Sequence, residues 1–183
     1  MTTSPLRKAV FWDRDGTLMR EVDYCGDPAF VEAIPGAGDA LRDLSSHGWL
    51  HVIITNQSGI GRGFFSEEDF HAVNDELFRQ LGVNPDAVYF CPDAPQAASS
   101  RRKPSPTMVI EACRDLGIDP TQSWFVGDKE VDIDCGRASG CRTILVLTGY
   151  GADCAATCRP DFIEPSAPAA ARRILSAPHH GLP

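Results

Sequence analysis

The 183-residue sequence lacks any apolar run long enough to cross a membrane, and its first residues lack the apolar core of a signal peptide. A transmembrane helix needs about 20 consecutive apolar residues, and a signal peptide needs a shorter apolar core near its start. We therefore expect no membrane association and a cytoplasmic location. The sequence also has no internal repeat and no linker. We expect a single domain over residues 1–183, with a core at about 7–176 and a flexible tail at 177–183.

Basic residues are scarce. The chain has 17 Lys and Arg against 25 Asp and Glu, which gives a formal net charge of −8. Proteins that bind nucleic acid neutralise phosphates with basic side chains, so this balance argues against a nucleic-acid partner. If the ligand is a smaller anion, the positive charge must be concentrated locally.

Two common site patterns are missing. The seven cysteines contain no CxxC, and Cys154-x-x-x-Cys158 has no accompanying His motif, so we expect reduced thiols rather than a zinc site. The glycine-rich Gly59–Gly63 stretch lacks the G-x-G-x-x-G spacing and follows the second predicted strand instead of the first. We therefore reject a dinucleotide-binding site.

Short apolar runs alternate with amphipathic stretches along the whole chain. The strands are predicted at 8–12, 50–54, 87–90, 123–126, 143–147 and, more weakly, 161–163. The helices are predicted at about 37–47, 66–81, 105–117, 130–139 and 166–176, with a capping box at Ser66 and with Ser105 as N-cap before Pro106. This alternation predicts an α/β fold, a Rossmann-like parallel sheet with helices on both faces.

Polar side chains stand where the predicted strands end. Asp13-Arg14-Asp15-Gly16-Thr17 follows the first strand, and Thr55-Asn56-Gln57-Ser58-Gly59 follows the second. Arg102-Lys103-Pro104 precedes the helix after the third strand, and Gly127-Asp128-Lys129-Glu130-Val131-Asp132 follows the fourth. In a parallel sheet all four segments lie along one edge, where ligands bind. Asp13 and Asp15 alone could form a solvated acidic turn, but the joint order predicts one cavity in which a cation or substrate offsets their repulsion.

This order of segments resembles that of the haloacid dehalogenase (HAD) superfamily of aspartate-nucleophile phosphatases, over roughly residues 8–150. DRDGT resembles the first motif of that superfamily, Thr55 the second, Lys103 the third, and Gly127-Asp128 with Asp132 the fourth. TNQSG, RGFF, RKP and GDK are similar to the branch that contains histidinol phosphatases and heptose-bisphosphate phosphatases. The intervals from Asp13 to Thr55 and from Thr55 to Lys103 leave no room for a separate cap domain, so we expect an open cleft.

The resemblance implies a role for each motif residue. Asp13 would attack phosphorus and form an aspartyl-phosphate. Asp15 would protonate the leaving alkoxide and then activate water, and the neighbouring acid is expected to favour its protonated form. Thr55 would hold phosphate oxygens, and Lys103 would neutralise the nucleophile and the phosphoryl group.

The resemblance also implies a metal ion and substrate contacts. Mg²⁺ is the expected cofactor, bound by the Asp13 side chain, the Asp15 carbonyl and the Asp128 side chain. Asp132 is either a further ligand or a residue that contacts the ligands without touching the metal. The substrate would contact residues from the second, third and fourth segments, namely Asn56, Gln57, Ser58, Arg62, Arg102 and Lys129.

One departure from the branch affects the expected loop at 91–103. Its relatives usually hold a structural zinc with a Cys-x-His pair and a Cys-x-Cys pair, whereas this chain has Cys91 and Asp93, then Ser99 and Arg101. A single remaining thiolate is not a zinc site, so we predict no zinc and a loop ordered by other contacts.

The sequence thus predicts a monomeric, Mg²⁺-dependent phosphomonoesterase for a small-molecule phosphate ester, with a sugar or heptose (bis)phosphate as the leading substrate. Histidinol phosphate is the alternative substrate. A phospho-ligand-binding protein without turnover is the alternative of another class, and the intact acidic, hydroxyl and lysine positions argue against it. A phosphoryl-accepting signalling receiver is disfavoured because its acceptor aspartate ends a later strand.

Overall fold

The structure is a computed structural model that describes residues 6–177, so the expected tail lies outside it except for Ala177. Six strands form one parallel sheet in the order β3-β2-β1-β4-β5-β6. The strands are β1 (Ala9–Trp12), β2 (Leu50–Asn56), β3 (Ala87–Cys91), β4 (Trp124–Gly127), β5 (Arg142–Val146) and β6 (Phe162–Glu164). The predicted fold class is confirmed.

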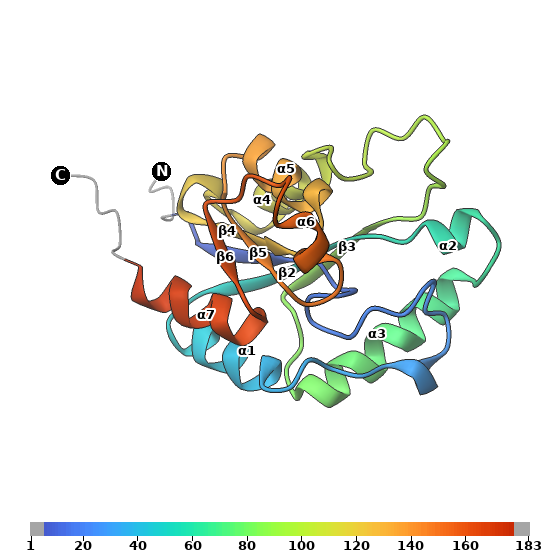
Figure 1. Ribbon diagram of the computed structural model, residues 1–183, viewed down its shortest axis with the longest axis horizontal. Helices are drawn as coiled ribbons and strands as arrows, with labels where there is room; N and C mark the ends of the chain where they lie inside the picture. Colours follow the sequence, from blue (N-terminus) through green and yellow to red (C-terminus); the bar gives the residue numbers. More distant parts are fainter. Residues whose placement is uncertain (1–5, 178–183) are drawn as a thin grey trace.

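Helices cover both faces of the sheet (Figure 1). One face carries α1 (Ala37–Ser46), α3 (Glu67–Leu81) and α7 (Ala167–Ser176), whose apolar residues share a buried cluster with inward side chains of β1, β2 and β4. The other face carries α4 (Thr107–Leu116) and α5 (Glu130–Ala138), which pack on the opposite side chains of the same strands. The short helices α2 (Ser58–Gly61) and α6 (Gly151–Cys154) follow β2 and β5, and 3-10 turns occupy Pro28–Phe30 and Pro120–Gln122.

Local signals account for the element boundaries. Ser66 and Asp69 form the predicted capping box of α3, in which Ser66 Oγ accepts from the Asp69 N–H and the Asp69 carboxylate accepts from the Ser66 N–H. Gly82 ends that helix at φ 64°, a conformation that costs glycine little. The prediction for α4 was wrong by one position, since Pro106 occupies the N-cap and Thr107 begins the helix.

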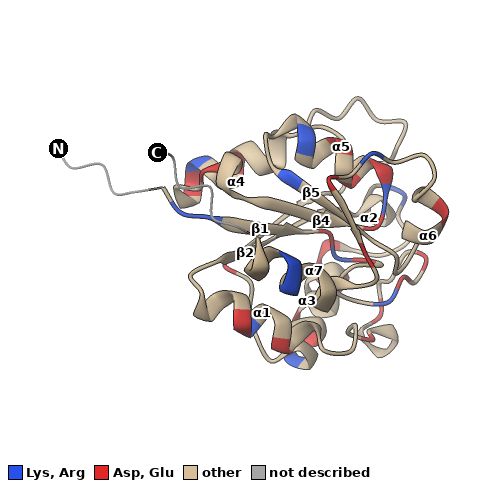
Figure 2. Cartoon of the chain, turned by 60° about the vertical axis from the view of Figure 1, so that its left-hand side comes forward, with Lys and Arg blue, Asp and Glu red and all other residues tan. Residues whose placement is uncertain are grey.

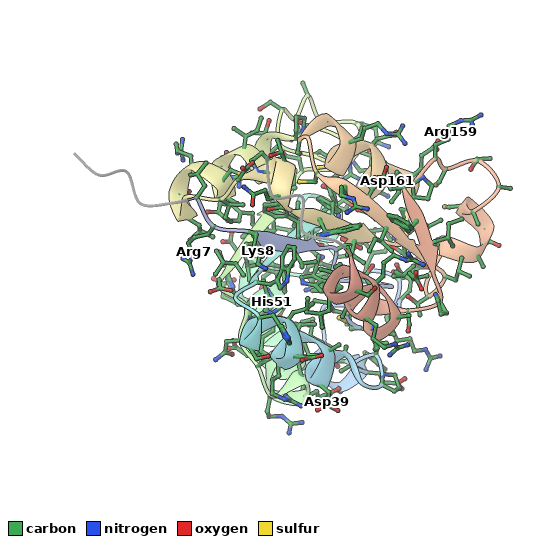
Figure 3. All side chains as sticks on the ribbon, turned by 90° about the vertical axis from the view of Figure 1, so that its left-hand side faces the viewer. Arg7, Lys8, Asp39, His51, Arg159 and Asp161 are labelled. Carbon is green, nitrogen blue, oxygen red and sulfur yellow. The ribbon has the colours of Figure 1, made fainter. Side chains whose placement is uncertain are left out.

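His51 is a buried histidine that links β1 to α1 through hydrogen bonds. Trp12 Nε1 donates to His51 Nδ1 at 3.2 Å, while His51 Nε2 lies 2.9 Å from the Leu41 carbonyl oxygen. The side chain of His51 lies between the sheet and α1 (Figure 3) and is 1% exposed. Because Trp12 can only donate, the imidazole is neutral with its proton on Nε2. Burial lowers the pKa of His51.

The chain order brings four motifs to one edge of the sheet. β1 lies between β2 and β4, so the strand order reverses there, and ligands of open α/β sheets bind at such a point. Between Asp13 and Thr55 the chain forms one 3-10 turn and α1, and between Thr55 and Lys103 it forms α2, α3 and β3. Neither interval holds a separate cap domain. Within residues 6–177 no helix has the length and apolarity needed to span a membrane.

Candidate active site

A pocket of about 210 Å³ lies at the carboxyl ends of the strands. Charged residues of both signs gather at this end of the molecule, away from the termini (Figure 2). Most of the predicted site residues line the pocket, namely Asp13, Asp15, Thr55, Asn56, Gln57, Ser58, Arg102, Lys103, Lys129 and Asp132. The predicted gathering of the four segments is therefore observed.

Lys103 links the first, third and fourth segments. Its Nζ donates to Asp13 Oδ1 at 2.6 Å and to the Ile54 carbonyl at 2.8 Å, and it lies 2.6 Å from Asp132 Oδ1. Burial disfavours the charged amine, but the two carboxylates outweigh it and raise the pKa of Lys103. The lysine is therefore a fixed positive charge beside Asp13.

Asp128 sits in a tight cradle beneath this pair. One oxygen, Oδ2, accepts from the Tyr150 N–H at 2.8 Å. A Cβ at Gly16 or at Gly149 would collide with the same oxygen, and both glycines have positive φ. The other oxygen, Oδ1, is buried and has no hydrogen-bond partner among the described residues. An unpaired buried carboxylate oxygen is costly unless a cation meets it.

The donor set fits a hard divalent cation. In the described part of the chain, Asp13, Asp128 and Asp132 form the only group of three or more candidate ligating side chains, with ligand atoms within 4.8 Å of one another. Burial and the neighbouring carboxylates raise the pKa values of Asp13 and Asp128, although Lys103 opposes the effect at Asp13. Oxygen ligands of this kind suit Mg²⁺, and such an ion would relieve the repulsion among the carboxylates.

Asp15 is held differently from Asp13. Arg14 donates to Asp15 Oδ2 through Nε at 3.1 Å and to Oδ1 through Nη2 at 3.0 Å, and Gln57 Nε2 adds a bond of 2.8 Å to Oδ2. Burial favours the neutral acid, but Arg14 and Gln57 outweigh it and hold the pKa of Asp15 below its usual range. The expectation that the neighbouring acid would favour a protonated Asp15 was therefore wrong for the ligand-free site, because the adjacent guanidinium dominates.

Thr55 and Asn56 end β2, and their side chains bond to Gln57 and to Lys103. Thr55 Oγ1 accepts from Gln57 Nε2 at 2.8 Å. Asn56 bonds both backbone groups of Lys103, accepting from its N–H at 3.0 Å and donating to its carbonyl at 3.2 Å. Arg62 does not line the pocket; its guanidinium lies over the Tyr24 ring, 5.5 Å from the centroid. Asn56 therefore fixes the third segment against the second.

Two cationic side chains flank the pocket. Lys129 Nζ pairs with Glu21 at 3.0 Å and lies 4.5 Å from the centroid of the Tyr150 ring. Burial disfavours its charge, but Asp13, Asp128 and Glu21 raise the pKa of Lys129. Arg102, from the 91–103 loop, also lines the pocket. The local positive charge required for an anionic ligand is therefore present.

Comparison with known proteins gives consistent matches. Residues 8–134 match the family model described as polynucleotide kinase 3 phosphatase, and residues 100–170 match a HAD-hydrolase-like model. The chain is 41% identical over 154 residues to the D-glycero-beta-D-manno-heptose-1,7-bisphosphate 7-phosphatase of Haemophilus ducreyi, covering 78% of this chain and 85% of that protein. It is 40% identical to the D-glycero-D-manno-heptose-1,7-bisphosphate 7-phosphatase of Thermosynechococcus vestitus, covering 79% and 81%.

The chain belongs to the haloacid dehalogenase superfamily of phosphatases. It is a phosphoric monoester hydrolase. A solved structure supports this assignment: the D,D-heptose 1,7-bisphosphate phosphatase of B. bronchiseptica, complexed with magnesium and phosphate, superposes with a TM-score of 0.86 at 31% identity. That comparison covers 92% of this chain and 98% of the other.

In the 91–103 loop of this HAD phosphatase, the residues at the four expected zinc-ligand positions form hydrogen bonds. Cys91 Sγ lies 3.3 Å from Ser99 Oγ and 3.5 Å from Asp93 Oδ2. Ser99 Oγ accepts from the N–H groups of Arg101 and Arg102, each at 3.3 Å. Hydrogen bonds therefore join the four positions at which the resemblance implied zinc ligands.

Sequence reasoning missed several residues of this HAD phosphatase site. Glu21 and Tyr150 line the pocket, and Thr148 Oγ1 donates to the Gly16 carbonyl at 2.5 Å. Thr148 and Tyr150 follow β5, so the rule that ligands sit at strand ends could have indicated them. Asn74 is a polar residue on the buried face of α3, a signal that the apolar stripe of that helix conceals.

Proposed function

We propose that this HAD phosphatase hydrolyses a heptose bisphosphate at one phosphate and releases inorganic phosphate. The observation that carries the proposal is the position of Asp13. One of its oxygens is 2.6 Å from the Lys103 ammonium, and it faces a pocket that also holds Asp15 and Thr55. The names of the relatives that cover most of the chain support a heptose bisphosphate as substrate.

The residues would act in two steps. Asp13 attacks phosphorus to form an acyl phosphate, and the bond to the sugar oxygen breaks while Asp15 gives that oxygen a proton. Water then attacks the aspartyl-phosphate as Asp15 takes a proton from it, which releases phosphate and restores Asp13. The dianionic substrate brings negative charge beside Asp15, which raises its pKa and lets it carry the first proton.

Neutralisation of the phosphoryl charge would come from groups already in place. Lys103 balances the nucleophile and an equatorial phosphoryl oxygen, while Thr55 and the N–H groups after it hold the others. Mg²⁺, when bound by the Asp13 and Asp128 side chains and the Asp15 carbonyl, would supply further charge neutralisation. Asp132 Oδ2 accepts from the Lys129 N–H at 3.0 Å, and Asp132 Oδ1 forms an ion pair of 2.6 Å with Lys103 without a hydrogen bond among the described residues. We therefore assign Asp132 to positioning Lys103.

The far phosphate of a bisphosphate needs a second cationic contact. Arg102 and Lys129 line the same pocket as Asp13, and neither is assigned to the reacting phosphate in this scheme. Arginine presents a planar fork that matches phosphate, whereas lysine acts as a point charge. We propose that these two side chains, with Asn56, Gln57 and Ser58, set which phosphate ester is accepted.

The test is phosphate release, with Mg²⁺, from a substrate panel. The panel contains both anomers of the heptose 1,7-bisphosphate, histidinol phosphate, a hexose 6-phosphate and a 3′-phosphorylated oligonucleotide. We expect a kcat/KM for one heptose anomer at least about tenfold above every other member, and about 1000-fold less turnover in Asp13→Asn, which lacks the nucleophile. Preference for histidinol phosphate would overturn the substrate, and undiminished turnover in Asp13→Asn would overturn the nucleophile.

A further inference from the structure

A buried arginine stands between the two catalytic acids. Arg14 is 1% exposed and does not line the pocket, so it is placed to act on its neighbours rather than on a ligand. Its Nε and Nη2 donate to the two oxygens of Asp15, and Nη2 also donates to Gln57 Oε1 at 3.1 Å. The fork of the guanidinium therefore fixes both oxygens of one carboxylate at once.

The remaining nitrogen of Arg14 is held from outside the four motifs. Asn74, in the middle of α3 and 3% exposed, accepts from Arg14 Nη1 through Oδ1 at 2.9 Å. Phe70, one turn earlier in the same helix, lies against the guanidinium with its ring centroid 5.2 Å from Cζ. Helix α3 thus supplies both an aromatic ring and a hydrogen-bond acceptor for the guanidinium of Arg14.

The contacts use separate nitrogens of the guanidinium. Asn74 takes Nη1, while Asp15 takes Nε and Nη2, so the two partners do not compete. Without an acceptor at position 74, Nη1 would be left unpaired in a buried site, at a cost of about 1–3 kcal/mol or more for a charged group. The side chain would then turn to find another partner and carry the Asp15 carboxylate out of its orientation.

We propose that Asn74 is a positioning residue for proton transfer, acting on Asp15 through Arg14. This inference rests on the proposed function, in which Asp15 protonates the leaving oxygen. A small displacement of the Asp15 carboxylate is enough to slow the reaction, since moving a reacting group by about 1 Å can lower the rate about a hundredfold. Asn74 itself touches neither substrate nor metal.

The proposal predicts a dependence on the leaving group. A sugar alkoxide is a strongly basic leaving group and needs the proton from Asp15, whereas p-nitrophenolate leaves without protonation. Loss of the Asp15 orientation should therefore slow phosphoenzyme formation from the sugar phosphate and spare formation from p-nitrophenyl phosphate. A general loosening of the fold would slow both reactions equally.

The experiment compares wild type, Asn74→Leu and Asn74→Asp on the heptose bisphosphate and on p-nitrophenyl phosphate. Single-turnover rates are measured with Mg²⁺ in excess, so that formation of the phosphoenzyme is separated from its breakdown. Asn74→Leu keeps the branched shape of the side chain but removes the acceptor, and it should lower the sugar-phosphate rate at least about tenfold more than the aryl-phosphate rate. Asn74→Asp keeps an acceptor oxygen and should hold the ratio of the two rates within about threefold of wild type.

Two further variants keep the result decisive. Asp75→Asn changes the exposed neighbour of Asn74 on α3 and should leave both rates unchanged. Arg14→Lys keeps the charge but loses the fork, and it should reproduce the selective loss even if Asn74→Leu does not fold. An equal fall on both substrates, or no fall on either, in folded variants would overturn the proposal. Absence of turnover in the wild type would instead overturn the proposed function.

Discussion

The ammonium group of Lys103 lies 2.6 Å from Asp132 Oδ1, across the boundary between the third and fourth segments. The other oxygen of Asp132 accepts from the N–H of Lys129, so the same carboxylate caps α5 and holds the lysine. Lys103 in turn contacts Asp13. The sequence left Asp132 open as either a metal ligand or a supporting residue. Its Oδ1 forms an ion pair with Lys103, whereas Asp128 Oδ1 has neither a hydrogen bond nor an ion pair among the described residues, and this separates the two roles.

Replacement of Asp132 by Asn should therefore affect turnover more than metal binding. The variant loses a charged partner of Lys103, an interaction of about 1.5–3 kcal/mol, so we expect kcat to fall about 10- to 100-fold. Asp128→Asn is the comparison, because Asp128 Oδ1 has neither a hydrogen bond nor an ion pair among residues 6–177. Mg²⁺ affinity, measured by calorimetry, should fall much more in Asp128→Asn. Equal losses of affinity would identify Asp132 as a direct ligand.

Ser99 should control substrate affinity through the 91–103 loop. Its hydroxyl accepts from the N–H groups of Arg101 and Arg102, so Ser99→Ala frees the segment that carries Arg102 to the pocket. We expect KM to rise about 3- to 10-fold, corresponding to about 0.5–1.5 kcal/mol for one hydrogen bond, with kcat unchanged. Ser100→Ala is the matched control, because the described contacts of Ser100 run through its carbonyl oxygen. A fall in kcat with unchanged KM would contradict this role.

The purified protein should contain no stoichiometric zinc. Cys91 and Asp93 stand next to Ser99 and Arg101 instead of further thiolates or imidazoles, and structural zinc sites use four strong ligands. We expect elemental analysis of protein prepared without added zinc to find well under one equivalent. Chelator treatment should also leave the melting temperature unchanged once Mg²⁺ has been restored. One equivalent of zinc per chain would refute the prediction.

Protonation of His51 should destabilise the fold below neutral pH. Its pKa is lowered by burial, so the unfolded chain binds the proton first as pH falls below about 6.5, and the free energy of unfolding decreases. Wild type should lose up to about 1.4 kcal/mol per pH unit relative to His51→Gln, which cannot take up the proton. Chemical denaturation with a chelator present, at pH 7.5 and pH 5.5, measures the difference between the two proteins and so cancels the other titrating groups.

The matched control for this experiment is His71→Gln. His71 is exposed on α3, so its replacement leaves the buried Trp12–His51 hydrogen bond in place. The slope of stability against pH in this variant should therefore follow that of wild type. If the stability of His51→Gln changed with pH as that of wild type does, protonation of His51 would make no contribution to the pH dependence of stability.

Particular residues show where prediction from the sequence succeeded. Asp13, Thr55, Lys103 and Asp128 were expected at one sheet edge, and the structure places them there because parallel strands all end on the same side. The capping box at Ser66 was found for a local reason, since its partner is three residues away. Strand and helix periodicity likewise depends on near neighbours.

The errors and omissions concern contacts between distant segments. The expectation of a protonated Asp15 was wrong, because Arg14 beside it and Gln57 after β2 both donate to its carboxylate and lower its pKa. Arg62 is not in the pocket lining but lies over Tyr24, which is, so its contact with the substrate stays a prediction. The role of Asn74 was missed, because its side chain lies within the apolar stripe of α3 and 60 residues separate it from the arginine that it holds.

The sequence by itself determined the order of strands and helices, the HAD motifs and hence the class of reaction, because those depend on residue type and local spacing. Only the tertiary structure decided how the acids differ: Asp13 faces a lysine, Asp15 is held by an arginine, and one oxygen of Asp128 has no partner in the described part of the chain. The physical reason is that charge and proton affinity in a buried site are set by which groups approach within a few ångströms. That proximity arises from packing between elements far apart in the chain.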